Sequence, residues 1–154
     1  MRPTVTEQLR GCARLLDEVV AAEVAGSEAE QVVSEVVRNL RMIESSWTQV
    51  LPFLWWDNEA TLTILTSSRK VPGDVAARIE AARQNPLPEA WDVTAVEARN
   101  DVLRELLSEV ITTLDSAADD ALHRTIREHL MTRAKRYPMR TVPQLSQSTA
   151  ERSK

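Results

Sequence analysis

The sequence predicts an all-α protein: a compact bundle of about six helices with one long helix near residues 27–51 as its spine. Apolar side chains recur at three- and four-residue steps over most of the chain, which is the period of an amphipathic helix. Glycine occurs only three times, and helix-favouring Leu, Ala, Glu and Arg are abundant. Residues 4–7, 27–30 and 94–97 each fit the capping-box pattern that opens a helix.

The first predicted helix begins at the capping box of Thr4 and Glu7 and should end near Gly26, because glycine relaxes the left-handed position past a helix end. Cys12, the single cysteine, falls within the apolar stripe of this helix. We therefore expect it to be a small core residue rather than a nucleophile.

The second capping box opens the long helix, whose apolar positions run from Val32 to Val50. The short connection before it predicts that these first two helices pair antiparallel. Pro52 lacks an N–H and disfavours helix at Leu51, so the spine should stop or kink there.

Polar and proline residues place the later boundaries. Asp57 is predicted to cap a helix that ends near residue 68, and Asp74 to cap another that ends at Gln84. The linker 85–88 follows, pinned to the body by Trp91. The third capping box then opens a strongly apolar helix, and a last helix stops at Pro138. The predicted domains are 1–138, a single helical domain, and 139–154, a flexible polar tail.

Charge is distributed unevenly along the chain, whose net charge is −4. Residues 1–122 carry 11 basic and 21 acidic side chains, whereas residues 123–154 carry 8 and 2. No apolar run reaches the roughly 18 residues that span a bilayer, and the N-terminus lacks the apolar segment of a secretion signal. We expect a cytoplasmic protein that engages neither membrane nor nucleic acid, since its body is acidic.

No catalytic motif is visible: there is no phosphate-binding glycine loop, no dinucleotide fingerprint and no nucleophile elbow. His123 and His129 are six residues apart and cannot share one face of a helix. We therefore predict no metal site and no cofactor, and expect no catalytic activity from the chain by itself.

Two features are candidate interaction sites. The first is the aromatic run after the proline, with Phe53, Trp55 and Trp56 as candidate partner-binding residues, since tryptophan is over-represented in binding hot spots. The alternative, that these rings are core, stays open. The second is a basic cluster that would face an anion or a partner, unless it is simply a solvated helix end. Its members are Arg124, Arg127, Arg133, Lys135, Arg136 and Arg140.

Two segments, MRPTVTEQLRGCARLLDEVV and LRELLSEVITTLDSAADDALHRTIREHLMTRAKRYP, carry a family resemblance. They resemble small helical proteins encoded beside aminoglycoside-phosphotransferase-like kinases and acyl-CoA dehydrogenases. The resemblance implies an accessory protein that works with such a kinase to phosphorylate a hydroxyacyl-CoA. It covers about half of the chain, does not include residues 47–91, and assigns no catalytic residue.

The predicted function is therefore a non-catalytic accessory or interaction subunit that binds a larger protein partner. We expect this subunit to hold no cofactor. Its partner would be a phosphotransferase-like kinase in acyl-CoA catabolism. The alternative is a stand-alone helical domain that binds a small ligand or acts as an enzyme, with a pocket lined by Trp47, Trp55 and Trp56. The sequence leaves self-association open.

Overall fold

The computed structural model describes residues 3–68, 71–89, 91–114 and 120–139. These residues form helices and no strand, which confirms the all-α class. They make five helices where the sequence predicted about six, if the continuous first helix, residues 5–23, is counted once. The chain divides into two compact units: the first contains the described residues up to Ser45 together with Met139, and the second spans Ser46–Pro138. The predicted tail lies almost wholly outside the described residues, so the predicted domain boundaries stay a prediction.

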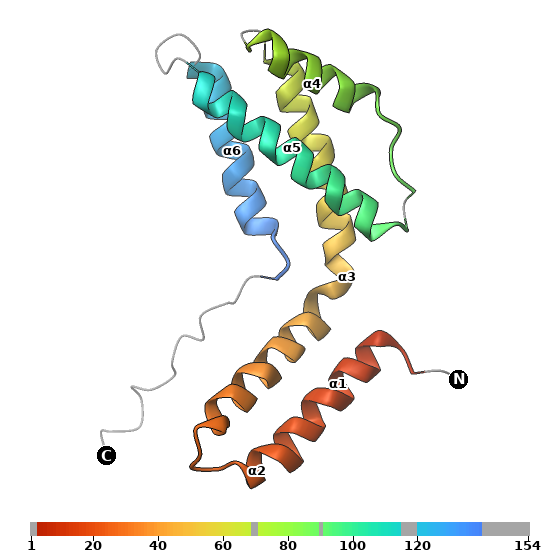
Figure 1. The fold of residues 1–154 in the computed structure, drawn as a ribbon, viewed down its shortest axis with the longest axis vertical. Helices are drawn as coiled ribbons and strands as arrows, with labels where there is room; N and C mark the ends of the chain where they lie inside the picture. The colour runs from red at the N-terminus through yellow and green to blue at the C-terminus, as the bar shows by residue number, and fades with distance from the viewer. Residues whose placement is uncertain (1–2, 69–70, 90, 115–119, 140–154) are drawn as a thin grey trace, which may run out of the picture. The chain divides into compact units, whose positions relative to one another are not determined.

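The first unit is a helical hairpin (Figure 1). Its first arm is continuous through α1 (Val5–Leu15), the π-helical stretch η1 (Leu16–Val20) and α2 (Ala21–Glu23). Its second arm is the start of α3 (Ala29–Ser67), which runs antiparallel to the first. The predicted capping box at Thr4 is present, with both reciprocal hydrogen bonds to Glu7.

The turn of this hairpin follows the prediction in part. Gly26 adopts the left-handed conformation with φ 77°. The second capping box is wrong in detail, because the Glu30 carboxylate accepts from the Gly26 N–H at 2.7 Å instead of reaching Ser27. Cys12 is exposed, so its assignment to the core was wrong.

The predicted stop at Pro52 is wrong, because α3 runs through it: the helix is 39 residues long and ends at Ser67. A proline at this position removes one intrahelical hydrogen bond and crowds the preceding turn. Burial on its C-terminal side offsets that cost, since Phe53 and Leu54 are only 6% and 7% exposed. Asp57 is consequently a buried residue inside α3, and its assignment as a helix cap was also wrong.

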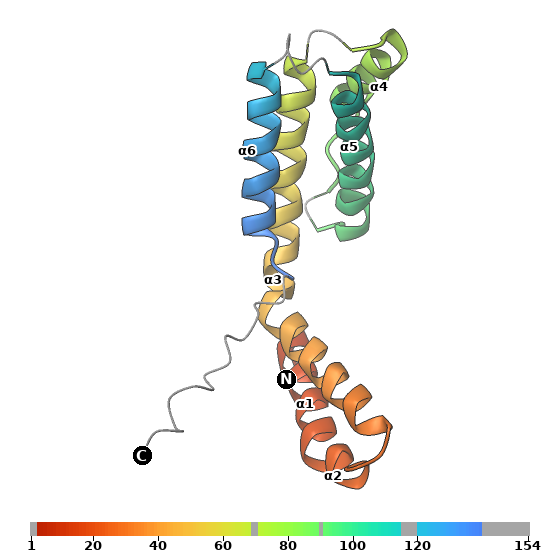
Figure 2. The same cartoon turned by 90° about the vertical axis from the view of Figure 1, so that its left-hand side faces the viewer.

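The second unit consists of the rest of α3 with α4 (Gly73–Gln84), α5 (Val93–Thr113) and α6 (Asp120–Arg136), which lie side by side in Figures 1 and 2. Its core contains apolar residues from all four helices, among them Leu65, Ile79, Leu103, Leu106 and Ile126. This core holds α6 against α3 and α5, and so positions the polar residues described below.

Three smaller predictions about this unit were wrong. The cap of α5 is Asp92, whose side chain accepts from the Ala95 N–H at 3.0 Å, instead of Thr94. Asp74 lies in the first turn of α4 and does not cap it. Trp91 is 77% exposed, so it does not anchor the linker to the rest of the unit.

Among the described helices, none combines the length and apolar character that crossing a bilayer requires.

Candidate functional site

A network of polar side chains lies inside the second unit, where α3, α5 and α6 meet. The Asp57 side chain on α3 has no exposed surface. Its Oδ2 accepts from Arg133 Nε of α6 at 2.9 Å and from Asn100 Nδ2 of α5 at 2.8 Å. A buried carboxylate is costly unless it is paired and hydrogen-bonded. Asp57 therefore ties three helices together at one point.

Three further residues complete this Asp57 network. Asn58 accepts from the same Asn100 amide at 2.8 Å and donates to the Val96 carbonyl at 3.1 Å. On the other side of Asp57, Thr61 Oγ1 lies 3.1 Å from His129 Nε2. The spacing explains the arrangement, since Asp57 and Thr61 are four residues apart on α3 and therefore share one face.

Besides Asp57 and Arg133, the network contains one more titratable residue, His129. Its Nε2 lies 3.4 Å from Asp57 Oδ1, a buried oxygen with no hydrogen-bond partner among the described residues. Burial lowers the pKa of His129, the Asp57 carboxylate acts to raise it, and the Arg133 guanidinium acts to lower it. The lowered pKa of His129 favours the neutral imidazole near pH 7.

The network does not have the geometry of a hydrolytic triad. In a triad the base uses one ring nitrogen for the nucleophile and the other for the carboxylate. Here Thr61 and Asp57 both approach Nε2 of His129. Thr61 and Asp57 also have no exposed surface, so a substrate cannot reach them. The arrangement ties α6 to α3 and does not match the triad geometry.

An aromatic layer lies beside this network and reaches the surface. Trp56 is half-buried, and its ring centroid is 5.6 Å from that of His129. The Arg136 guanidinium lies 4.5 Å from the centroid of Trp56, within the range of a cation–π interaction. Phe53 is buried below, in an edge-to-face contact with the exposed Tyr137 at 5.5 Å. We call Trp56, Arg136 and Tyr137 the aromatic–basic surface.

A hollow of about 200 Å³ opens at this surface, and Gln49, Pro52, Phe53, Trp56 and Arg136 line it. Drug-sized ligands usually occupy pockets of roughly 300–1,000 Å³, so this hollow is small for one. Trp47 and Trp55, which the sequence placed in a ligand pocket with Trp56, are not among its lining residues.

The other predicted site residues are dispersed. Trp55 is half-buried against the cluster of Phe53, Leu54 and Val96. Arg133 belongs to the Asp57 network. Arg140 lies outside the described residues. The remaining members of the basic cluster are exposed on α6: Arg124, Arg127, Lys135 and Arg136. Whether any of these residues meets a partner stays a prediction.

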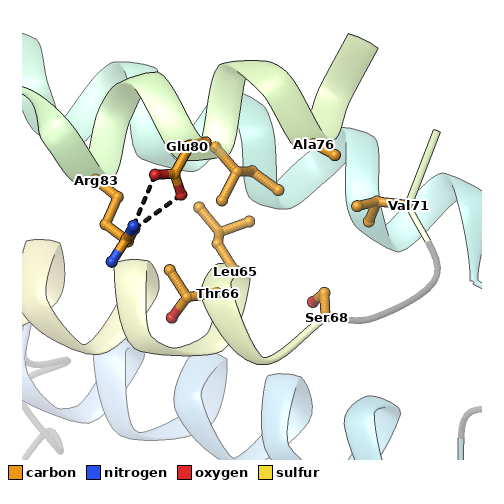
Figure 3. A pocket seen from close by; sticks show the side chains of 8 residues that line it. Leu65, Thr66, Ser68, Val71, Ala76, Glu80 and Arg83 are labelled. Carbon is orange, nitrogen blue, oxygen red and sulfur yellow. Dashed lines mark hydrogen bonds and ion pairs between the residues drawn. The ribbon is translucent and has the colours of Figure 1, made fainter. Parts of the chain in front are cut away.

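A second hollow, of about 350 Å³, lies between the end of α3 and α4 (Figure 3). Its polar residues are already paired: Glu80 accepts from Arg83, and the hydroxyls of Thr66 and Ser68 donate to carbonyls of α3. The polar side chains that line this hollow therefore have hydrogen-bond partners within the chain. Among the described residues, no three His, Cys, Asp or Glu side chains lie close enough to hold a metal ion.

Sequence reasoning missed the Asp57 network, although one signal was present. Asp57 and Thr61 continue the stripe that begins at Phe53 and runs on to Leu65, at steps of four residues. Polar residues in an otherwise apolar stripe predict a buried polar network once the helix is allowed to continue past Pro52. The predicted break at that proline concealed the pattern.

No family model matches the chain, and neither a curated protein nor a solved structure is significantly similar to it.

Proposed function

We propose that this chain is a non-catalytic accessory subunit that binds a larger protein through the aromatic–basic surface. The observation that carries the proposal is the stacking of Arg136 on Trp56 at 4.5 Å, at an accessible hollow of the second unit. Arginine and tryptophan are the residue types most enriched among the energetic hot spots of protein interfaces. A partner side chain that entered the hollow would contact both residues.

The Asp57 network supports this proposal because it fixes the surface from below. Arg133 is held by Asp57 and lies 5.5 Å from the Phe53 ring centroid, while Trp56 packs beside His129. A surface held in one arrangement loses less conformational entropy on binding than a mobile one. The size of the hollow favours an inserted side chain over a whole small ligand.

The class of partner follows from the family resemblance. It suggests a phosphotransferase-like kinase that acts on hydroxyacyl-CoA. The exposed basic residues of α6 would orient an acidic face of that kinase and speed association more than they would tighten binding.

The test is the affinity of the full chain for such a kinase, measured by calorimetry. Trp56→Ala and Arg136→Ala should each weaken binding at least tenfold, about 1.4 kcal/mol. Trp91→Ala and Arg127→Ala are matched controls, because they remove the same residue types at exposed positions elsewhere, and they should leave the affinity unchanged. Absence of binding, or an equal loss in the controls, would contradict the proposal.

A further inference from the structure

The hollow of the aromatic–basic surface presents one uncompensated positive charge. Of the described residues that line it, only Arg136 carries a formal charge. Arg133, three residues earlier on α6, pairs with the buried Asp57 carboxylate at 2.9 Å, so its charge is compensated inside the unit. Lys135 is exposed and does not line the hollow. A ligand that enters the hollow therefore meets the charge of a single guanidinium.

The polar side chains at this hollow have N–H groups without acceptors. The Arg136 guanidinium lies over the Trp56 ring, 4.5 Å from its centroid. Stacking uses the face of the guanidinium, whereas its N–H groups point outward in its plane and stay available. Neither these groups, nor the Trp56 indole N–H, nor the Gln49 amide has a hydrogen-bond partner among the described residues.

A carboxylate is the acceptor that matches this arrangement. The edge of a guanidinium binds both oxygens of a carboxylate, and the two groups carry one charge each. A phosphate monoester would bring nearly two negative charges to a single cation. The remaining lining, Pro52 and Phe53, offers no polar side-chain atom, so the group beside the carboxylate has to be apolar.

We propose that the hollow binds a segment of the partner protein in which an apolar side chain lies next to an aspartate or glutamate. The apolar side chain enters the hollow against Pro52 and Phe53, and the carboxylate accepts from the edge of Arg136. This inference rests on the proposed function, because it names the chemistry of the partner segment at the aromatic–basic surface. Trp56 holds the guanidinium in place before the partner arrives, which lowers the entropic cost of binding.

The experiment compares two short synthetic peptides, capped at both ends, one with leucine beside glutamate and the other with leucine beside glutamine. NMR of the full chain follows the indole N–H signals of its four tryptophans, and Trp56→Phe assigns that of Trp56. The acidic peptide should shift the Trp56 signal with at least tenfold higher affinity than the amide peptide, while the signal of the exposed Trp91 stays fixed. The chain has a net charge of −4, so a non-specific electrostatic effect would favour the amide peptide instead.

Substitutions of Arg136 assign the preference to its guanidinium. Arg136→Gln should bind both peptides equally, because it removes the charge. Arg136→Lys keeps the charge without the planar fork and should lose most of the preference. Arg127→Gln is the matched control: it removes an exposed arginine of the same helix that does not line this hollow, and it should keep the full preference.

Absence of binding by either peptide, equal affinities of the two peptides for the wild type, or an unchanged preference in Arg136→Gln would each overturn this inference. The comparison of the two peptides on the wild type needs no variant to fold. The peptides also separate this inference from the proposed function. A kinase that binds the wild type while the two peptides bind equally contradicts the carboxylate alone, whereas a kinase that does not bind contradicts the proposed function whatever the peptides do.

Discussion

The two units of this chain both have apolar stripes at helical spacing, but they bury very different fractions of those apolar side chains. In the second unit Val96, Leu103 and Val110 have no exposed surface, and the Asp57 carboxylate is buried among polar partners. In the first unit, Ala13 and Val37 are the buried residues of the described part. Apolar stripes at helical spacing are present in both. The difference lies in the number of neighbouring helices, because a stripe is buried only where other stripes surround it.

Both units have exposed ion pairs, but the second unit also has a buried one, with no counterpart among the described residues of the first. The Asp57–Arg133 pair is anchored by a carboxylate with no exposed surface, whereas the Arg41 and Asp17 side chains are 59% and 49% exposed. Exposed pairs contribute about 0–1 kcal/mol, whereas removing one partner of a buried pair costs about 3–5 kcal/mol. The same chemistry should therefore have unequal effects in the two units.

The largest expected effect comes from deleting the buried carboxylate. Asp57→Ala should lower the free energy of unfolding of the second unit by about 3–5 kcal/mol, because it leaves Arg133 and Asn100 without their shared acceptor. Asp17→Ala, the matched change in the hairpin, should cost less than about 1 kcal/mol. Urea unfolding followed by circular dichroism measures both losses of stability. Equal losses would show that burial does not make the Asp57 pair more important for stability than the exposed Asp17 pair.

The next effect compares two leucines on α3 and α5. Leu106 is 1% exposed in the core of the second unit, so Leu106→Ala should cost about 2–5 kcal/mol. Leu40 is half-buried in the hairpin, and Leu40→Ala should cost roughly 1 kcal/mol or less in the monomer. The measurement is thermal unfolding at low protein concentration, where a large loss for Leu40→Ala would show that the hairpin is covered.

Local signals predicted three local features correctly, although the helix caps predicted at Asp74 and Thr94 were also local and were wrong. The capping box at Thr4, the left-handed Gly26 and the end of a helix at Gln84 each depend on a few adjacent residues, and the structure confirms all three. Predictions that depended on distant neighbours were wrong. Cys12 was placed in a core because it lies in an apolar stripe, but that stripe has no helix to cover it in the described chain.

The Asp57 network shows the same limit. Asn100 and Arg133 are 43 and 76 residues from Asp57 in the sequence, and no local pattern connects them. The prediction also treated Pro52 as a stop or a kink, although α3 stays helical there with Phe53 and Leu54 packed beside it. The aromatic run itself was recognised, and the structure adds that Arg136 stacks on Trp56.

The smallest expected effect is the pH dependence that His129 confers. Burial lowers its pKa from the ordinary 6.5, so on acidification the unfolded chain takes up this proton before the folded chain does. The contribution of this residue to stability is therefore complete above about pH 6.5 and is lost as the pH falls below it. His129→Gln should flatten this slope in urea midpoints measured from about pH 7.5 to 5. An unchanged slope would show that His129 is not the group responsible.

Amide hydrogen exchange in the full chain tests the contrast between the units most directly, because exchange reports local opening residue by residue. We expect slow exchange in α5 from Leu103 to Val110. Amides of α1 and of α3 before Ser45 should exchange rapidly, because Ala13 and Val37 are the buried residues of the described part of this unit. Slow exchange in α1, equal to that in α5, would contradict the account.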